Sequence, residues 1–241
     1  MTAQTNPLEQ YFRKNDRRLI HKWVHYFDVY HRHFERFRDQ KPVVLEFGVS
    51  QGGSLQMWRD YFGRGARIHG VDINPKCKEL EQRRTKIFIG DQADRDFLRS
   101  IADEIGPIDV VIEDGGHYFP QQINTFEEIF PRVTENGVFL IEDLHTSYWP
   151  KKYGGGLKQP GTFIEYAKDL TDQLNAWHSR EPNFQVDEIT RTVRSMHWYD
   201  SIIVFEKGNV TKPHAERTGS ATVKDPNWRG RRARRRLLRR S

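Results

Sequence analysis

Lys41–Val49, KPVVLEFGV, opens the part of the chain that decides the fold, and Ser50–Ser54, SQGGS, follows it directly. The first stretch is an apolar run that reaches a glycine, which predicts a buried strand followed by a tight turn. Leu55, Trp58 and Phe62 then recur at helical spacing, so a helix should begin just after the glycines. A strand, a glycine turn and a helix in this order are the first half of a βαβ unit.

The same alternation continues downstream. Apolar runs typical of strands return at Ala66–Asn74, Lys86–Asp91, Ile108–Asp114 and Gly137–Leu144. Between them, Asp94–Ile105 and Gln121–Phe130 carry the helical pattern. Strands that alternate with helices in this way predict a doubly wound α/β fold, similar to the Rossmann fold, with a mostly parallel sheet.

Further elements flank this region. Leu19–Phe37, dense in aromatic residues and histidine, predicts an N-terminal helix that would act as a lid. His145–Gly161 is expected to be a loop rich in glycine and aromatic residues, and Thr162–His178 a helix. Phe184–Arg194 and Trp198–Glu206 are expected to close the sheet as an antiparallel pair, which makes it seven-stranded. We therefore expect an N-terminal helical segment over 1–40, a sheet domain over 41–207 and a disordered tail over 208–241.

The net charge of +6 is unevenly distributed along the chain. Eight arginines lie in the last residues: Arg229, Arg231, Arg232, Arg234, Arg235, Arg236, Arg239 and Arg240. Without these eight the rest of the chain carries −2, so the body is mildly acidic and the basic character belongs to the tail. A cluster of like charges predicts a disordered arm that is attracted to anionic surfaces such as membranes or nucleic acid.

The composition also sets the expected compartment. Cys77 is the only cysteine, so no intrachain disulfide can form. No apolar run approaches the roughly 18 residues that cross a bilayer, and Met1–Arg13 is too polar for a secretory signal. We expect a cytoplasmic protein, with the arginine tail as a candidate for peripheral contact with a membrane.

The turn after the first strand is the first candidate ligand site. Glycines there let the backbone approach a ligand, and the following helix offers unpaired N–H groups. A dinucleotide fingerprint would read G-x-G-x-x-G, but Gly48 is followed by no glycine until Gly52, so that match is poor. An ordinary βα turn is the alternative.

Two other strand ends carry carboxylates. Asp72 lies 24 residues after Gly48, where an acidic residue can accept hydrogen bonds from a ribose diol. The alternative for Asp72 is a helix cap, although Asn74 suits that role better. Asp91, beside Gln92, could take the exocyclic amine of adenine, or it could be ordinary turn chemistry.

The most informative group is acidic. Asp114 ends the fourth predicted strand, and Glu142 and Asp143 end the fifth, so neighbouring parallel strands would bring them to one edge. Clustered carboxylates repel one another unless a cation or proton is shared, and a hard divalent cation is the natural partner. Strand residues alternate faces, so Glu142 and Asp143 both reach the cleft only if the strand ends there. His117 is a candidate general base. Helix capping by these carboxylates is the alternative.

Together these motifs resemble the metal-dependent sugar O-methyltransferases of macrolide biosynthesis, the macrocin and mycinamicin type, within the class I methyltransferases. The resemblance runs from about Lys22 to Lys207. It rests on the segments LEFGVSQGGSLQMW, GVDINP, GDQ, EDGGH and GVFLIEDLHTSYWP. It implies a methyltransferase domain over 41–207 and S-adenosylmethionine as the methyl donor.

The resemblance also implies roles for individual residues. Glu46, Gly48 and Ser54 would line the methionine part of S-adenosylmethionine, Asp72 would hold the ribose, and Asp91 with Gln92 the adenine. Asp114, Glu142 and Asp143 would bind Mg²⁺, and His117 would be the catalytic base. The sequence departs from many relatives in Gly116, where serine is expected, and it lacks the long N-terminal domain of some relatives.

The expected reaction is methyl transfer to a sugar hydroxyl of a glycan or glycosylated natural product. Tyr148, Trp149 and Tyr153 would stack on the sugar, unless the first two pack in the core. Tyr26 or Tyr30 would touch the cofactor as part of the lid. We also expect a homo-oligomer of undetermined size. The alternatives are a methyltransferase for a catechol-like or other small diol, and a non-catalytic protein that binds anionic surfaces.

Overall fold

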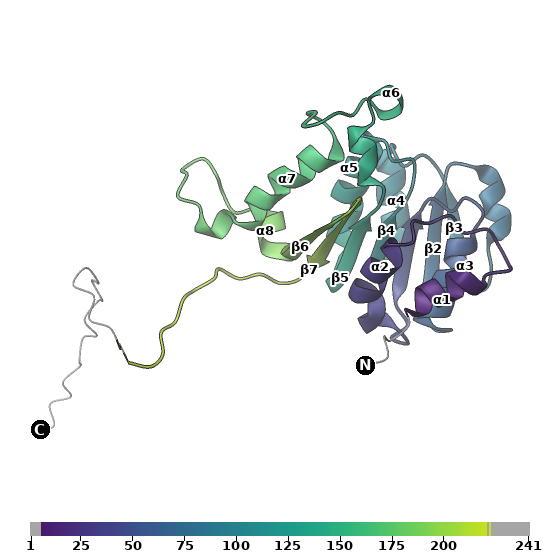
Figure 1. Ribbon diagram of the computed structural model, residues 1–241, viewed down its shortest axis with the longest axis horizontal. Coiled ribbons are helices and arrows are strands. Elements are labelled where there is room, and N and C mark those ends of the chain that lie inside the picture. The colour runs from purple at the N-terminus through teal and green to yellow at the C-terminus, as the bar shows by residue number, and fades with distance from the viewer. Residues whose placement is uncertain (1–5, 221, 223–241) are drawn as a thin grey trace, which may run out of the picture. The chain divides into compact units, whose positions relative to one another are not determined.

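The computed structural model describes residues 6–220 and 222, and the chain up to Thr211 forms one compact unit. That unit is built on a seven-stranded sheet in the order β3-β2-β1-β4-β5-β7-β6. The strands are β1 (Val43–Phe47), β2 (Arg67–Asp72), β3 (Thr85–Ile89), β4 (Ile108–Glu113), β5 (Val133–Ile141), β6 (Val193–Tyr199) and β7 (Ile202–Lys207). Strands β1 to β5 pair in parallel, whereas β7 is antiparallel to β5 and to β6. The predicted doubly wound, mostly parallel sheet is therefore confirmed (Figure 1).

Helices connect and cover the strands. The α-helices are α1 (Pro7–Lys14), α2 (Tyr26–Phe34), α3 (Gly53–Phe62), α4 (Arg95–Ile105), α5 (Phe119–Ile129), α6 (Pro150–Tyr153), α7 (Phe163–Leu174) and α8 (Glu188–Thr192). Short 3₁₀ turns are η1 (Glu35–Phe37), η2 (Pro75–Leu80), η3 (Phe130–Arg132), η4 (Leu144–Tyr148) and η5 (Ala176–His178). The predicted start of α4 is confirmed, because the Asp94 side chain accepts hydrogen bonds from the first-turn N–H groups.

The sheet separates two hydrophobic cores because side chains alternate faces along each strand. In β1, Leu45 and Phe47 pack with the apolar faces of α4, α5 and α7. Val44 points to the other face and packs with α1, α2 and α3. Strand order reverses between β1 and β4, and in such sheets ligands bind in the crevice beyond the carboxyl ends of these strands.

The N-terminal helix is shorter than the sequence predicted. Of Leu19–Phe37, only Tyr26–Phe34 is α-helical, and Leu19–Val24 forms an irregular segment that we call the N-terminal strap. The strap crosses directly over the start of α3, where a Cβ on Gly53 would lie 2.3 Å from the Leu19 backbone oxygen. Gly53 therefore makes room for the strap. A continuous helix was the wrong prediction: the strap runs across α3 and sends the Lys22 side chain to carboxylates at the ends of β4 and β5.

The closing strands also differ from the prediction. Most of Phe184–Arg194 is not a strand, and β6 begins only at Val193. The Asp187 side chain accepts from the Thr190 N–H at 2.9 Å and the Thr190 hydroxyl accepts from the Asp187 N–H, so a capping box starts α8 there. The predicted strand Trp198–Glu206 contains the end of β6, a turn and β7. The chain reverses at Ser201, whose φ of +63° is the left-handed conformation of a tight hairpin. The antiparallel pairing itself is confirmed.

Helix α2 is tied to this hairpin by His33. Its Nδ1 lies 2.7 Å from a Glu206 carboxylate oxygen and its Nε2 2.9 Å from the Tyr199 hydroxyl. Burial lowers the pKa of His33, which favours a neutral ring that donates to Glu206 and accepts from Tyr199. The last strand of the sheet thereby fixes the helix that follows the strap.

Within the described residues, no helix is long and apolar enough to cross a membrane. The arginines from Arg229 to Arg240 lie outside the described residues. The predicted disorder and surface binding of the tail therefore stay predictions.

Candidate active site

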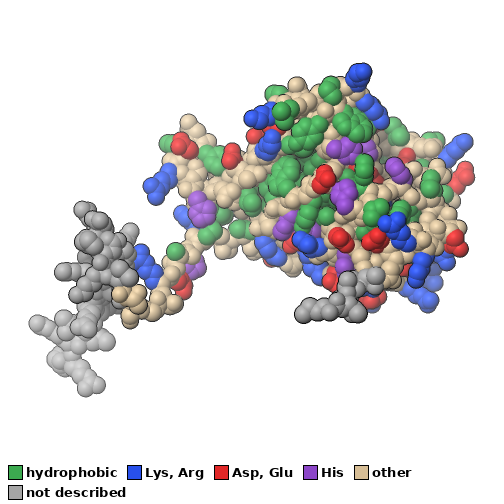
Figure 2. Space-filling model, in the orientation of Figure 1, with side chains coloured by type: hydrophobic (Ala, Val, Ile, Leu, Met, Phe, Trp, Pro, Cys, Tyr) green, Lys and Arg blue, Asp and Glu red, His purple; other side chains and the backbone are tan. Residues whose placement is uncertain are grey.

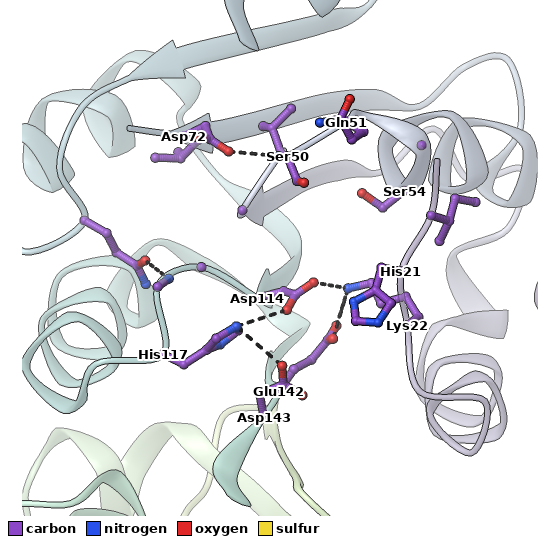
Figure 3. Close-up of a pocket in the computed structure, with 18 of the residues that line it drawn as sticks. His21, Lys22, Ser50, Gln51, Ser54, Asp72, Asp114, His117, Glu142 and Asp143 are labelled. Carbon is purple, nitrogen blue, oxygen red and sulfur yellow. Dashed lines mark hydrogen bonds and ion pairs between the residues drawn. The ribbon is translucent and has the colours of Figure 1, made fainter. Parts of the chain in front are cut away.

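A cavity of about 600 Å³ opens at the carboxyl ends of the parallel strands (Figure 3). The loops that follow β1 to β5 line it, and the N-terminal strap forms one wall. Nine predicted site residues line this cavity: Gly48, Ser54, Asp72, Asp91, Gln92, Asp114, His117, Glu142 and Asp143. Separate strand ends thus meet in one site, as the parallel sheet requires.

The loop after β1 passes very close to the loop after β4. Gly48 has a φ of +90°, and a Cβ on it would lie 1.9 Å from the Asp114 backbone oxygen. Any larger residue would push these two loops apart, so glycine is required here. Gly53 and Ser54, the first residues of α3, line the cavity and bring unpaired helix N–H groups to it.

Glu46 is the predicted site residue that does not line the cavity. Its side chain is fully buried, and its two oxygens accept from the Ser54 hydroxyl at 2.7 Å and the Trp58 indole at 3.0 Å. Lys22 lies 3.7 Å away. Glu46 therefore acts from below the cavity floor, where it orients Ser54.

Asp72 lies where the ribose was expected. Its two oxygens accept from the backbone N–H groups of Ser50 and Asn74, each at 2.8 Å. A carboxylate has about four lone-pair positions, so two bonds leave capacity for a diol. Helix capping belongs to Asn74, whose side chain accepts from the Lys76 N–H.

Asp91 and Gln92 differ in what they offer the cavity. Asp91 is exposed and makes one side-chain bond, to the Ala93 N–H at 2.8 Å. Gln92 is buried: its Nε2 donates to Glu113 at 2.5 Å, and its Oε1 accepts from the Gly116 N–H at 3.3 Å. Gln92 therefore links the loops after β3 and β4, and Asp91 retains the accessible oxygen.

The acidic residues and His117 gather at the other end of the cavity. His117 Nε2 lies 3.4 Å from Asp143 and 3.9 Å from Asp114. Strand β5 ends at Ile141, and Asp143 has a φ of +56°. That left-handed turn lets both Glu142 and Asp143 line the cavity, which strand alternation alone would prevent.

Sequence reasoning missed Lys22, which the strap inserts into this group (Figure 3). Its side chain is only 3% exposed. Its Nζ lies 2.5 Å from Asp114 and 2.9 Å from both oxygens of Glu142. The available signal was indirect: several carboxylates were predicted at one edge of the sheet, and no basic side chain was predicted near them.

The two tyrosines of α2 contact the same carboxylates. Tyr26 donates to Asp143 at 2.8 Å, and Tyr30 donates to Glu142 at 2.7 Å. Their hydroxyls position the acidic group, and Tyr26 also lines the cavity, so the expected contact of Tyr26 or Tyr30 with the cofactor stays a prediction. Burial raises the pKa of Tyr30 well above its ordinary value, so it remains a donor.

The electrostatics follow from burial and charge. Burial alone would lower the pKa of Lys22, but the carboxylates of Asp114, Glu142 and Glu46 outweigh it and raise that pKa well above the usual value. Burial raises the pKa of Glu142 well above its ordinary range, and the neighbouring Asp114 adds to the rise. One ammonium thus faces several carboxylates, and the site favours further positive charge.

These donors suit a hard divalent cation. Ligand atoms of Asp114, His117 and Asp143 all lie within 4.8 Å of one another, and Glu142 is adjacent in the cavity. Carboxylate oxygens are the ligands that Mg²⁺ prefers. The hydroxyls of Tyr30 and Tyr26 donate to Glu142 and Asp143 and orient them, and metal ligands are commonly oriented by such hydrogen bonds.

The loop that follows β5 carries aromatic side chains. Tyr148 and Trp149 are 49% and 48% exposed, so they do not pack in the core. Trp149 lies 4.8 Å from the His145 ring and 6.0 Å from the Tyr153 ring, measured between centroids. Rings on this loop are available to an acceptor.

Comparison with known proteins identifies the domain. Residues 45–144 match the family described as a methyltransferase domain. The chain carries a methyltransferase domain. Every predicted site residue falls within that match, whereas Lys22 and the strap precede it.

The most similar relatives modify sugars on natural products. The chain is 38% identical to the 8-demethyl-8-alpha-L-rhamnosyl tetracenomycin-C 2'-O-methyltransferase of Streptomyces olivaceus, over 77% of this chain and 51% of that protein. It is 36% identical to the mycinamicin VI 2''-O-methyltransferase of Micromonospora griseorubida, over 77% of this chain and 49% of the relative. The methyltransferase chain thus spans about half the length of these relatives.

A solved structure is also similar. The mycinamycin-pathway methyltransferase MycE, in complex with Mg and SAH, matches with a TM-score of 0.73 and 33% identity. The match covers 85% of this chain and 54% of that one. The methyltransferase fold expected from the sequence is thereby confirmed.

Proposed function

We propose that this chain is an S-adenosylmethionine-dependent, Mg²⁺-dependent O-methyltransferase that acts on a sugar hydroxyl of a glycosylated small molecule. One observation carries the proposal: a cavity with a carboxylate at the β2 end for a ribose also holds Asp114, Glu142, Asp143 and His117 at its opposite end. The sugar specificity rests on the relatives, which are named for methylation of glycosylated natural products.

In this proposal the donor lies along the β1 to β3 side of the cavity. Asp72 accepts from the ribose hydroxyls, and Asp91, with Gln92 behind it, faces the adenine. Gly48 and Ser54 border the methionine part, and buried Glu46 fixes Ser54 from below. S-adenosylmethionine supplies an activated methyl group, so the protein has to position the acceptor and remove its proton.

Asp114, Glu142 and Asp143 would hold the Mg²⁺, with Tyr30 and Tyr26 fixing two of these carboxylates. Bound there, Mg²⁺ would act as a Lewis acid and lower the pKa of a sugar hydroxyl. Lys22 offsets part of the acidic charge. Because Mg²⁺ usually takes more oxygen ligands than these three residues offer, a diol of the acceptor would be able to bind it as well.

His117 would act as the base. Its Nε2 points to the acidic group, 3.4 Å from Asp143, and takes the hydroxyl proton as the new O–C bond forms and the C–S bond breaks. Its Nδ1 is buried with no hydrogen-bond partner in the described structure, so Nε2 is the nitrogen that faces the acceptor.

The test measures methyl transfer from labelled S-adenosylmethionine to 4-nitrophenyl α-L-rhamnopyranoside. EDTA should abolish transfer and Mg²⁺ should restore it. Asp114→Asn, Glu142→Gln and Asp143→Asn should lose Mg²⁺ binding in calorimetry but still bind S-adenosylhomocysteine. His117→Ala should keep the metal and lose about 10²–10⁴-fold in turnover.

Asp172→Asn is the matched control, because Asp172 is an exposed carboxylate on α7. It should leave turnover and metal binding unchanged. Full activity in EDTA would remove the metal from the proposal, and loss of S-adenosylhomocysteine binding in all three carboxylate variants would show that these residues hold the cofactor instead.

A further inference from the structure

Exposed apolar side chains gather around the mouth of the catalytic cavity. Among the described residues, Leu19, Trp23, Val24 and Ile73 are large, apolar, at least 44% exposed and part of its lining. Tyr148 and Trp198, also exposed, line a neighbouring cavity. Figure 2 shows hydrophobic side chains beside histidines on the visible face of the compact unit. Soluble domains seldom concentrate apolar surface in this way unless something binds there.

The neighbouring cavity measures about 460 Å³. Leu144 and Tyr148 from η4 form one side, Ile164 from α7 another, and Trp198 from β6 a third. Tyr148 and Trp198 are 49% and 42% exposed. His145, Lys168, Thr171, Asp200 and Ser201 add polar groups, so the lining combines ring faces with polar side chains. The volume is in the range typical of sites for small molecules.

The two cavities adjoin at His145. Asp143 lines the catalytic cavity, and the next residues, Leu144 and His145, line the second. The His145 ring is held by a 2.6 Å bond to the Ser201 hydroxyl and stands 5.8 Å from the Trp23 ring. A molecule with its reacting hydroxyl at Asp143 therefore has a second, partly apolar recess next to it.

We propose that the second cavity binds the apolar aglycone of the acceptor while the sugar lies at the acidic group. This inference rests on the proposed function, because the sugar's position is defined by Asp143 and His117. A sugar alone presents mostly hydroxyls, which need the polar cavity, whereas an aromatic or macrocyclic aglycone gains by leaving water. Tyr148 and Trp198 offer ring faces to it.

The experiment compares two probes, methyl α-L-rhamnopyranoside and 4-nitrophenyl α-L-rhamnopyranoside. Their binding is measured by calorimetry with S-adenosylhomocysteine and Mg²⁺ present, so no turnover is needed. The aryl glycoside should bind about tenfold more tightly, because burial of one ring removes considerable apolar surface from water. Trp198→Ala and Tyr148→Ala should lose this preference and keep the affinity for the methyl glycoside.

Two further variants make the test specific. Leu157→Ala removes an exposed side chain that lines neither cavity and should keep the preference. Thr171→Trp, on the α7 wall, should fill the second cavity and abolish the preference without removing any ring. Binding of S-adenosylhomocysteine, unchanged in every variant, confirms folding.

An equal affinity for both glycosides, or a preference that survives Trp198→Ala and Thr171→Trp, would overturn the inference. A sedimentation experiment could also overturn it. If the parent self-associates while Trp198→Ala is monomeric and binds both probes as the parent does, the surface around Trp198 is an interface between copies of the chain. If the protein transfers no methyl group, but the preference for the aryl glycoside is present in the parent and lost in the variants, the proposed function is contradicted. The binding of an apolar group in the second cavity is then still supported.

Discussion

Lys22 is the side chain on which the acidic end of the cavity most depends. It comes from the irregular strap, yet it contacts carboxylates from the ends of β4 and β5. Removing one partner of a buried charge group leaves the others without compensation, which is far more destabilising than loss of a surface ion pair.

We expect Lys22→Met to lower the free energy of unfolding of the metal-free protein by about 3 kcal/mol. Urea unfolding in EDTA measures this, and added Mg²⁺ should recover more stability in the variant than in the parent. The control is Lys168→Met, which breaks an exposed pair with Glu165 and should change stability by less than about 1 kcal/mol. A Lys22→Met protein as stable as the control would contradict a buried charge group.

The candidate site could be predicted in part from single residues. Asp72, Asp114, Glu142 and Asp143 were found because strand ends in a parallel sheet converge, so their place in the sequence determines their place in the fold. The position of Lys22 depends instead on the path of an irregular strap. No periodic pattern encodes that path, and the bonds of Tyr26 and Tyr30 to the acidic group were not predicted for the same reason.

At the scale of elements, the parallel strands were predictable and the closing hairpin was not. β1 to β5 have continuous apolar sequences because both faces of the sheet are covered. β6 lies at the sheet edge and is only partly buried, so its alternation is weak. The capping box at Asp187 starts α8 inside the predicted strand Phe184–Arg194, so β6 begins later, at Val193.

The edge formed by β2 and β3 contains an unusual histidine. Burial, followed by the nearby charges of Arg67 and Lys86, lowers the pKa of His69 to about 4. Both ring nitrogens are buried without a hydrogen-bond partner in the described structure. Protonation is therefore resisted in the folded protein but not in the unfolded chain.

This difference predicts an acid-dependent loss of stability. The pKa of His69 in the folded protein lies below the ordinary value of 6.5, so the stability that a neutral His69 contributes is present above pH 6.5 and is lost as the pH falls toward about 4. His69→Phe keeps a ring beside Phe88. Between pH 7 and 5 its free energy of unfolding should fall by about 1–2 kcal/mol less than that of the parent, a figure that already allows for the partial exposure of His69.

Urea unfolding at several pH values measures the effect. His214→Gln, at an exposed position, is the control and should follow the parent curve. Parallel curves for His69→Phe and the parent would show that His69 titrates alike in both states.

For the whole chain, the basic tail and the mildly acidic body should behave independently. Removal of residues 229–241 takes away eight arginines, and each contact with an anionic surface depends on salt. The truncated protein should elute from heparin at markedly lower salt and bind S-adenosylhomocysteine as before. Replacing Leu237 and Leu238 by serine keeps every arginine and should keep retention. Unchanged elution after truncation would exclude the tail as the binding element.

The strap and α2 contact residues that come much later in the sequence, which has a consequence for the order of folding. Tyr26 bonds to Asp143, and His33 bonds to Glu206, 173 residues later. During synthesis the N-terminal segment emerges first, but its partners exist only after the last strand has left the ribosome. Contacts this distant in sequence form late because long loops must close before them. We therefore expect the strap and α2 to dock late, after the partners that lie far downstream in the sequence have formed, and the acidic site to be completed only when the whole sheet is present.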